Sequence, residues 1–332
     1  MPKPQIYVTR VIPEEGLEMI RETSEAEVWG GNSPPPYEVL LEKVAGLDGL
    51  VCLLTDQIDG QLMDAAGGSL RVISQMAVGF DNIDIAAATE RGIPVGNTPG
   101  VLTDTTVDFA FALLMAAARR IVEGERYVKD GNWVTWEPTL LMGQDVHDAT
   151  LGLVGLGRIG QGMARRARGF GMRVIYSDPT ADEAEGKELE AEAYELDDLL
   201  AESDFVSLHV PLTPETTHLM GKREFELMKP SAILINTARG PAVDPSALYQ
   251  ALKEGEIAYA ALDVTEPEPI SVDDPLLTLD NCLIVPHIAS SSLATRSRMA
   301  TMAAENLEAG LNGAELPHCV NPEVYGLGLA RS

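Results

Sequence analysis

The sequence predicts an α/β fold in which helices cover parallel β-sheets in two domains. Short apolar runs alternate with helix-like segments almost throughout the chain, which is typical of parallel strands joined by crossover helices. At 332 residues the chain is long for a single domain. A glycine-rich turn lies near the middle of the chain, and the alternation restarts there. We therefore expect two parallel-sheet domains of the Rossmann-like or flavodoxin-like kind.

The part of the chain before residue 102 contains three predicted strands and three predicted helices. The strands are residues 6–9, 50–54 and 70–75, and the helices are residues 14–21, 37–45 and 61–66. The proline-bounded stretch 94–99 interrupts this pattern. A long apolar helix is predicted over residues 103–126, with Thr103 or Asp104 as its N-cap.

The alternation restarts at Thr150 with six predicted strands. These are residues 151–154, 173–176, 205–210, 232–236, 258–264 and 283–285. Six parallel strands with intervening helices match the two mononucleotide-binding halves of a Rossmann-like domain. A last helix is predicted over residues 293–312 and is followed by an irregular tail.

The turn after the first of these six strands has the spacing of a dinucleotide-binding loop. Gly155, Gly157 and Gly160 form a Gly-x-Gly-x-x-Gly pattern that opens into a helix-like segment, residues 161–169. In this motif the first glycine permits the turn, the second admits the pyrophosphate, and the third lets the helix pack on the strand. The next strand ends in Asp178, whose carboxylate can bind the adenosine ribose. An ordinary strand–turn–helix would explain the glycines but not this context.

Composition disfavours several classes of function. The formal charge of −27, from 51 acidic and 24 basic residues, argues against nucleic acid or an anionic membrane as a partner. The acidic cluster 182–202 is expected to form a solvated surface. Three scattered cysteines indicate neither disulfides nor a zinc site. No signal peptide and no apolar run of about 18 residues is visible, so a cytoplasmic protein is expected.

Three polar side chains follow the later strands, at the edge where α/β sheets bind ligands. Arg239, Glu268 and His287 come after the fourth, fifth and sixth strands. Arg239 can bind a carboxylate and polarise the adjacent carbonyl. His287 can donate a proton to the developing alkoxide, while Glu268 orients the other imidazole nitrogen. A nicotinamide would supply the hydride, so no metal is expected. Taken singly, each of these residues is more often a surface or structural group, so the site depends on the fold.

Long motifs along the chain resemble the D-isomer-specific 2-hydroxyacid dehydrogenases, most nearly the glyoxylate/hydroxypyruvate reductase branch. They include MAVGFDNIDIAAATERGIPVGNTPG, TLGLVGLGRIGQG, LINTARGPAVD, ALDVTEPEP and PHIASSS. The resemblance implies NADH-dependent reduction of small 2-oxo acids, with Arg239, Glu268 and His287 as catalytic residues. It also implies a discontinuous substrate-binding domain, residues 1–101 plus 290–332, and an NAD-binding domain, residues 102–289. The active site would lie in the cleft between the two domains.

The resemblance extends to the binding residues. The substrate would be bound by Leu54, Val78, Gly79, Arg239 and His287, with the backbone amides of Val78 and Gly79 holding its carboxylate. The cofactor would be bound by Thr103, Gly155, Leu156, Gly157, Arg158, Ile159, Gly160, Asp178, Pro179, Thr180, His209, Val210, Pro211, Thr216, Thr237, Ala238, Arg239, Asp263, His287 and Ala289. Relatives that prefer NADPH carry serine and arginine where this chain has Asp178 and Pro179. Because a carboxylate repels the 2′-phosphate, NAD(H) is expected.

Several finer expectations follow from the same resemblance. The family's acid stands directly before proline at a spacing from Asp263 that Glu268 matches and Glu266 does not. Ala289 and Met76 depart from the residues that are usual at their positions, which would affect the cofactor pose and the pocket size. The segment with Trp133 and Trp136 resembles the arm of a homodimer, in which Trp136 would either reach the partner's substrate pocket or only pack in the interface.

Two rival functions remain open at this point. A 3-phosphoglycerate dehydrogenase, or another D-2-hydroxyacid dehydrogenase, would share the fold and the catalytic residues. The first of these needs basic residues for the substrate phosphate, and none cluster near Val78 and Gly79. A dinucleotide-sensing corepressor would belong to a different class and can retain the same three residues, but it would be expected to carry an extended partner-binding tail.

Overall fold

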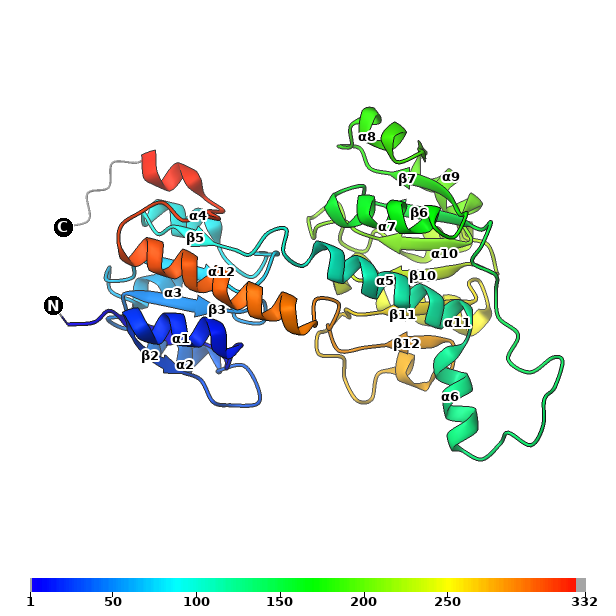
Figure 1. Ribbon diagram of the computed structural model, residues 1–332, viewed down its shortest axis with the longest axis horizontal. Coiled ribbons are helices and arrows are strands. Elements are labelled where there is room, and N and C mark those ends of the chain that lie inside the picture. Colours follow the sequence, from blue (N-terminus) through cyan, green and yellow to red (C-terminus); the bar gives the residue numbers. More distant parts are fainter. Residues whose placement is uncertain (1, 327–332) are drawn as a thin grey trace. The chain divides into compact units, whose positions relative to one another are not determined.

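The computed structural model describes residues 2–326, and the chain divides into two compact units (Figure 1). The first unit comprises Met1–Leu102 and Ser291–Ser332, and the second comprises Thr103–Ser290. Each unit contains one sheet of parallel strands with helices on both faces. This architecture confirms the predicted α/β fold class.

The sheet of the first unit has the strand order β2-β1-β3-β4-β5, which is the flavodoxin-like order. Its strands are β1 Gln5–Val8, β2 Glu25–Val28, β3 Gly49–Cys52, β4 Val72–Gln75 and β5 Val95–Gly96. Its helices are α1 Glu14–Thr23, α2 Tyr37–Lys43, α3 Gly60–Ala65, α4 Ile85–Glu90 and α12 Leu293–Leu311, with a 3-10 turn over Pro322–Gly326.

Two apolar cores lie on the two faces of this first sheet. α1 and α12 lie side by side over one face, where Leu17 and Met299 pack against Val8 (Figure 1). α2, α3 and α4 contribute to the other core, in which Leu40 and Leu62 pack with strand side chains. α12 therefore belongs to the first unit although it follows the second unit in the sequence, because its apolar face completes the core beside α1.

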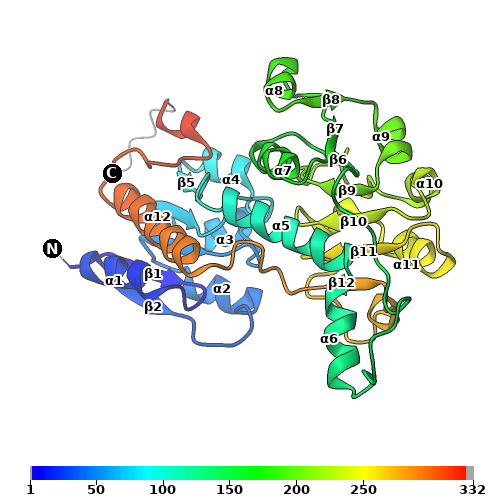
Figure 2. The same cartoon turned by 45° about the vertical axis from the view of Figure 1, so that its right-hand side comes forward.

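The sheet of the second unit has the order β12-β11-β10-β9-β6-β7-β8 (Figure 2). Its first six strands in the sequence follow the Rossmann order, and β12 extends the sheet by one strand. The strands are β6 Thr150–Val154, β7 Arg173–Ser177, β8 Ala191–Ala193, β9 Phe205–Leu208, β10 Ile233–Asn236, β11 Tyr259–Leu262 and β12 Cys282–Ile284.

Helices cover both faces of this second sheet. They are α5 Thr103–Ala118, α6 Ile121–Lys129, α7 Arg158–Arg168, α8 Glu183–Glu188, α9 Leu196–Glu202, α10 Lys222–Leu227 and α11 Pro245–Glu254. Leu153 and Ile235 pack in one core with α5 and α7. Val206 and Leu234 pack in the other core with α9, α10 and α11. Strands buried on both faces are expected of a parallel sheet.

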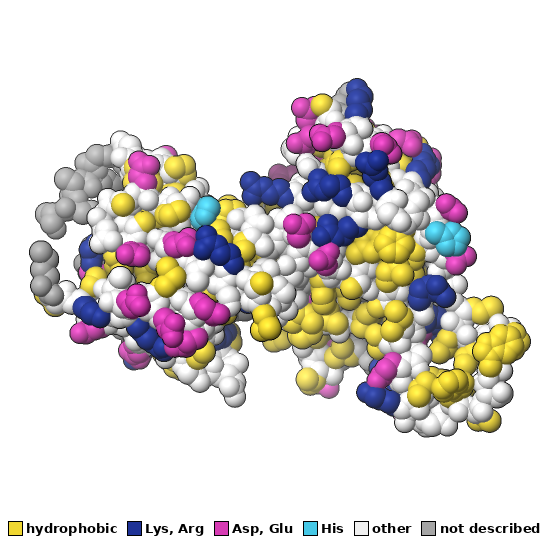
Figure 3. Space-filling view, in the orientation of Figure 1, with side chains coloured by type: hydrophobic (Ala, Val, Ile, Leu, Met, Phe, Trp, Pro, Cys, Tyr) yellow, Lys and Arg dark blue, Asp and Glu magenta, His cyan; other side chains and the backbone are white. Residues whose placement is uncertain are grey.

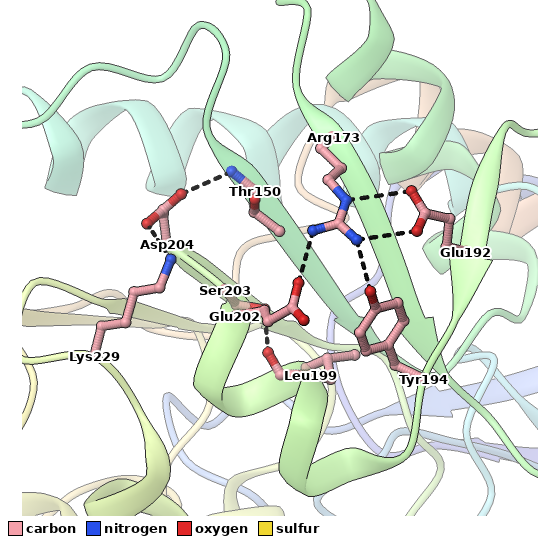
Figure 4. Close-up of polar contacts among 9 residues, drawn as sticks. All are labelled: Thr150, Arg173, Glu192, Tyr194, Leu199, Glu202, Ser203, Asp204 and Lys229. Atoms are coloured by element: carbon pink, nitrogen blue, oxygen red, sulfur yellow. Dashed lines mark hydrogen bonds and ion pairs between the residues drawn. The ribbon is translucent and has the colours of Figure 1, made fainter.

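Hydrogen bonds and ion pairs hold the amino ends of β6 and β7 in place (Figure 4). Arg173, at the start of β7, donates to Glu192, to Glu202 at 2.7 Å and to the Tyr194 hydroxyl at 2.7 Å. These hydrogen bonds, that with Glu192 first, raise the pKa of Arg173 above its ordinary value. Asp204 accepts from the Thr150 backbone N–H at 2.8 Å at the start of β6. Both strands are thus anchored at the edge opposite to their carboxyl ends.

The prediction of one continuous helix over residues 103–126 is wrong, because the structure contains two helices there. α5 ends at Ala118, and Arg120 adopts a left-handed conformation with φ of 50° before α6 begins. The Ala118 carbonyl accepts a hydrogen bond from the backbone N–H of Gln144 at 2.8 Å. The N–H of Gln144, which lies outside the helix, therefore binds the carbonyl that a continued helix would have offered to its own next turn.

Other predicted boundaries also change. The acidic stretch 182–202 is more than a solvated surface, since it forms α8, β8 and α9 and buries Leu199 and Leu200 completely. α7 begins at Arg158, three residues before the predicted start of this helix. β2, β5, β8 and α4 were not predicted, so the second sheet has seven strands where six were expected. Within residues 2–326, no helix combines the length and the apolar character that a membrane span requires.

Candidate active site

The glycine turn after β6 is shaped by close contacts between backbone atoms. Gly155 has a φ of +97°, and a Cβ there would lie 2.8 Å from the carbonyl oxygen of His209. A Cβ at Gly160 would lie 2.2 Å from the carbonyl oxygen of Gly155. By contrast, a Cβ at Gly157 would meet nothing within 4 Å. Packing therefore requires the first and third glycines, whereas the second faces open space in which a ligand can approach the backbone.

The N-terminus of α7 begins directly in this open space. Gly157 is its N-cap residue, and no side chain forms a capping hydrogen bond there. The backbone N–H groups of the first helical turn can therefore bind an anion, which the helix dipole also favours. The observed turn fits the diphosphate of a dinucleotide.

Asp178 follows β7 and binds the glycine turn through its carboxylate. Its Oδ2 accepts from the Leu156 backbone N–H at 2.8 Å, and its Oδ1 accepts from the Thr180 backbone N–H at 2.8 Å and hydroxyl at 2.7 Å. Burial alone would raise the pKa of Asp178, but these hydrogen bonds outweigh it and hold the pKa below its ordinary value. A negative charge therefore stands at the end of β7 at neutral pH.

Two further polar groups lie at the carboxyl ends of β9 and β10. His209 follows β9, and its Nε2 lies 2.9 Å from the Ser207 hydroxyl. Burial lowers the pKa of His209 to about 4, so the ring is neutral at neutral pH. The hydroxyl of Thr237, directly after β10, is buried and has no hydrogen-bond partner among the described residues. Such an orphaned hydroxyl is a group that a bound cofactor can satisfy.

His287 and Glu268 form a hydrogen-bonded pair. His287 Nδ1 lies 2.6 Å from Glu268 Oε1, and both side chains are partly exposed. Since Nδ1 faces the carboxylate, Nε2 is the ring nitrogen left for a substrate. The two residues come from the loops after β12 and β11, which are neighbouring strands of the sheet.

Asp263, at the end of β11, holds the loop that carries His287. Its two carboxylate oxygens accept from the backbone N–H groups of Ile288 at 2.7 Å and Ala289 at 2.8 Å. Its carbonyl oxygen accepts from the backbone N–H of His287 at 2.9 Å. Burial raises the pKa of Asp263, against the opposing effect of these two hydrogen bonds and of His287. His287 itself has a φ of +52°, a left-handed conformation that this set of bonds supports.

Arg239 lies in the turn that follows β10. The side chain of Asn236 ties this turn, since its amide donates to the Arg239 carbonyl at 2.9 Å and accepts from the Ala238 backbone N–H at 3.0 Å. A Cβ at Gly240 would lie 1.9 Å from the Thr265 carbonyl oxygen. Only glycine therefore allows the Arg239 turn to lie against the loop that continues to Glu268. All three predicted catalytic residues thus follow adjacent strands, β10, β11 and β12.

A second imidazole–carboxylate pair joins the loop after β9 to the loop after β11, and sequence reasoning missed it. His218 Nε2 lies 2.7 Å from Glu266 Oε2, and the His218 backbone N–H donates to the Pro241 carbonyl at 2.7 Å. Glu266 therefore pairs with His218, and Glu268 pairs with His287. No local signal links His218 to Glu266, because 48 residues separate them.

The predicted substrate residues of the first unit lie at the carboxyl ends of its strands. Leu54 follows β3, and Val78 and Gly79 follow β4. Met76, which had been expected to influence pocket size, is only 3% exposed and belongs to the core of the first unit.

The remaining predicted cofactor residues lie in loops of the second unit, except that Arg158 and Ile159 lie in the first turn of α7 and Thr103 lies at the start of α5. Thr216, in the loop after β9, donates from its hydroxyl to the Pro211 carbonyl at 2.6 Å. No cluster of three metal-ligating side chains is found among residues 2–326.

Trp136 lies on an exposed segment after α6. Its side chain is 78% exposed, and Trp133 is 61% exposed. Apolar side chains gather on this projecting part of the second unit (Figure 3). Contiguous exposed apolar groups are typical of an interaction surface.

Comparisons with known proteins indicate the family to which the chain belongs. Residues 111–289 match the model of the NAD binding domain of the D-isomer specific 2-hydroxyacid dehydrogenases. A glyoxylate reductase of Korarchaeum cryptofilum is 57% identical over 323 residues, which cover 97% of each chain. The solved structure of the TT0316 protein of Thermus thermophilus is 48% identical, with a TM-score of 0.90 over 95% of this chain and 99% of that chain.

A second solved structure contains bound ligands. It is the NADPH-dependent glyoxylate/hydroxypyruvate reductase of Sinorhizobium meliloti in complex with NADP and malonate, 31% identical, with a TM-score of 0.84 over 96% of this chain and 97% of that chain. The family match makes this protein an oxidoreductase that binds a nicotinamide dinucleotide. The chain belongs to the D-isomer-specific 2-hydroxyacid dehydrogenase family, in the branch that contains the glyoxylate reductases.

Proposed function

We propose that this protein reduces small 2-oxo acids, above all glyoxylate and hydroxypyruvate, to 2-hydroxy acids with NADH. The observation that carries the proposal is the 2.6 Å pair of His287 and Glu268 beside the Arg239 turn. This set combines a proton donor, its orienting carboxylate and a carboxylate-binding guanidinium. The names of relatives that are 48–57% identical, all glyoxylate reductases, support the choice of substrate.

Each residue has a distinct role in the proposed reaction. Arg239 binds the carboxylate of the 2-oxo acid and polarises the neighbouring carbonyl. His287 donates a proton from Nε2 to the carbonyl oxygen as negative charge develops there. Glu268 accepts the hydrogen bond from Nδ1 and stabilises the protonated ring. The bound nicotinamide supplies the hydride, and the backbone amides of Val78 and Gly79 hold the substrate carboxylate.

The proposed preference for NADH rests on Asp178. Family membership alone does not decide the cofactor, since the Sinorhizobium meliloti reductase is described as NADPH-dependent. In this chain the hydrogen bonds of Asp178 keep its pKa low, so the residue at the end of β7 is negatively charged. A carboxylate there accepts a hydrogen bond from a ribose hydroxyl and repels a 2′-phosphate.

The domain boundaries and the assembly of the protein enter the proposal as well. The first unit would bind the substrate, and the second unit would bind the cofactor. The exposed segment with Trp133 and Trp136 would form the interface of a homodimer, because large aromatic side chains are enriched at such interfaces.

The test is NADH oxidation, followed by the loss of absorbance, with glyoxylate, hydroxypyruvate, pyruvate and phosphohydroxypyruvate. We expect the highest kcat/KM with glyoxylate or hydroxypyruvate and a lower value when NADPH replaces NADH. The highest kcat/KM with phosphohydroxypyruvate would instead assign the protein as a 3-phosphoglycerate dehydrogenase. A parent protein that prefers NADPH would refute the role proposed for Asp178.

A further inference from the structure

Two loops of the first unit carry the predicted substrate contacts. Residues 53–58 follow β3 and include Leu54, whereas residues 76–83 follow β4 and include Val78 and Gly79. β3 and β4 are neighbouring parallel strands, so both loops leave the same edge of the sheet. A loop of this kind has no regular ladder of hydrogen bonds, and something else must hold it in one conformation.

Asn82 joins the two loops through its side-chain amide. Its Nδ2 donates to the carbonyl of Leu53 at 3.1 Å and to the carbonyl of Asp56 at 2.8 Å. These two carbonyls lie on either side of Leu54 in the sequence. The backbone of Asn82 adds a further bond, since its carbonyl accepts from the Ile58 N–H at 3.0 Å. Asn82 thus binds the Leu54 loop at three points.

Gln75 holds Asn82 and the second loop together. Its Nε2 donates to Asn82 Oδ1 at 2.6 Å and to the carbonyl of Gly79 at 2.9 Å. Gln75 is the last residue of β4 and is completely buried, so its position is set by the sheet. The bond to the Gly79 carbonyl fixes the backbone directly after the Gly79 N–H, which is one of the two amides that would hold the substrate carboxylate.

Asp56 closes the first loop on itself. Its Oδ2 accepts from the Leu53 backbone N–H at 2.8 Å and from the hydroxyl of Thr9, at the end of β1, at 2.5 Å. Asp56 is 1% exposed and Thr9 is fully buried. The network therefore runs from β1 through both loops to β4, without a break.

We propose that Gln75 and Asn82 are positioning residues, an amide bridge that sets the substrate-binding geometry of the first unit. The bridge acts through Leu54, Val78 and Gly79, and does not itself touch the substrate. This inference rests on the proposed function, because it takes those three residues as the substrate contacts. Small displacements of such contacts weaken substrate binding strongly, since the hydrogen bonds to a carboxylate depend on distance and direction.

The test uses a substitution that changes hydrogen bonding at nearly constant shape. Asn82→Asp replaces Nδ2 by an oxygen that faces the carbonyls of Leu53 and Asp56, so two attractive contacts become repulsive. Gln75→Glu does the same toward the carbonyl of Gly79. Asn82→Ala removes the bridge without adding a charge, and serves if an acidic variant does not fold.

Asn321→Asp is the matched control. The Asn321 amide is also buried in the first unit, where it donates to the Ile93 carbonyl at 3.0 Å and accepts from the Val95 N–H at 2.8 Å. Its partner Val95 is the first residue of β5, so Asn321 lies at the amino end of this strand, whereas the two loops follow the carboxyl ends of β3 and β4. The same chemical change there removes similar bonds from the same unit without touching the substrate contacts.

The measurements are KM and kcat for glyoxylate and the Kd of NADH, on the full-length protein below the melting temperature of every variant. Loss of the bridge should raise KM for glyoxylate about tenfold or more, while the Kd of NADH changes less than about twofold. Asn321→Asp should lower the melting temperature and leave KM unchanged.

The outcomes separate the inference from the proposed function. A KM for glyoxylate that is unchanged in both Asn82 variants, or that rises equally in Asn321→Asp, overturns the role of the bridge alone. A parent protein that oxidises NADH with none of the four 2-oxo acids overturns the proposed function, and this inference with it.

Discussion

Replacing Gly157 by alanine should separate cofactor binding from folding. A Cβ at this position meets no atom within 4 Å, and its φ of −64° is one that alanine adopts freely. Replacing glycine also restricts the unfolded chain, whereas alanine is a poorer N-cap residue, and the two effects oppose one another. The free energy of unfolding should therefore change by less than about 1 kcal/mol.

Cofactor binding, unlike stability, should be strongly weakened by the same substitution. The open space above Gly157 is where the motif brings the backbone closest to the pyrophosphate. A methyl group there pushes the phosphate away from the N–H groups of α7 and weakens charge-assisted hydrogen bonds. Loss of about 1.5–3 kcal/mol corresponds to a Kd for NADH that is roughly 10- to 150-fold higher.

Gly160→Ala is the contrasting variant. Its Cβ would lie 2.2 Å from the carbonyl oxygen of Gly155, so α7 would have to move away from the turn. Overpacking of this kind costs about 1–3 kcal/mol. Because this glycine packs the helix on the strand, its replacement should lower the melting temperature by several degrees, about 2–4 °C for each kcal/mol.

Thermal unfolding followed by circular dichroism and NADH titration followed by fluorescence measure the two effects on the same samples. Gly157→Ala should keep the melting temperature and lose NADH affinity, whereas Gly160→Ala should lose stability. A Gly157→Ala protein that binds NADH as tightly as the parent would refute the assignment of this turn to the pyrophosphate. Equal stability of Gly160→Ala and the parent would refute the packing argument.

Two further predictions concern protons. Glu268→Gln should lower kcat for glyoxylate reduction, because a neutral amide orients His287 and assists its proton donation less than a carboxylate does; an unchanged kcat would contradict the pairing. Burial lowers the pKa of His209 to about 4. Between about pH 6.5 and pH 4 the unfolded chain therefore takes up a proton that the folded chain does not. The free energy of unfolding consequently falls as the pH falls through this range. The melting temperature of His209→Gln should therefore decline less than that of the parent across this range, whereas parallel curves would mean that His209 contributes nothing.

Long periodic segments were the part of the fold that sequence patterns predicted well. The apolar runs that became β1, β3, β4, β6 and β7 are all buried strands, and their predicted ends differ from the observed ends by no more than two residues. β2 has an alternating, half-exposed pattern and β5 has only two residues, so neither presents a clear apolar run. The break between α5 and α6 depends on the bond from Gln144 to Ala118, which local patterns do not contain.

The candidate site also contains one contact that could be predicted from the sequence and one that could not. The resemblance to the family indicated Glu268 in preference to Glu266, and the structure places Glu268 against His287 at 2.6 Å. The pairing of Glu266 with His218 had no counterpart in the sequence reasoning, because nothing in the loop after β9 indicates which carboxylate it meets.

The sequence by itself determined the fold class, the family and the chemical groups that parallel strands bring to one edge. These follow from periodicity and from motifs, which are properties of residues close together in the chain. Only the tertiary structure decided how those groups are held, by Asp263 behind the His287 loop and by Gln75 and Asn82 between the two loops of the first unit. The reason is physical, since a side-chain hydrogen bond to a distant backbone carbonyl depends on an orientation that exists only once the sheet has folded.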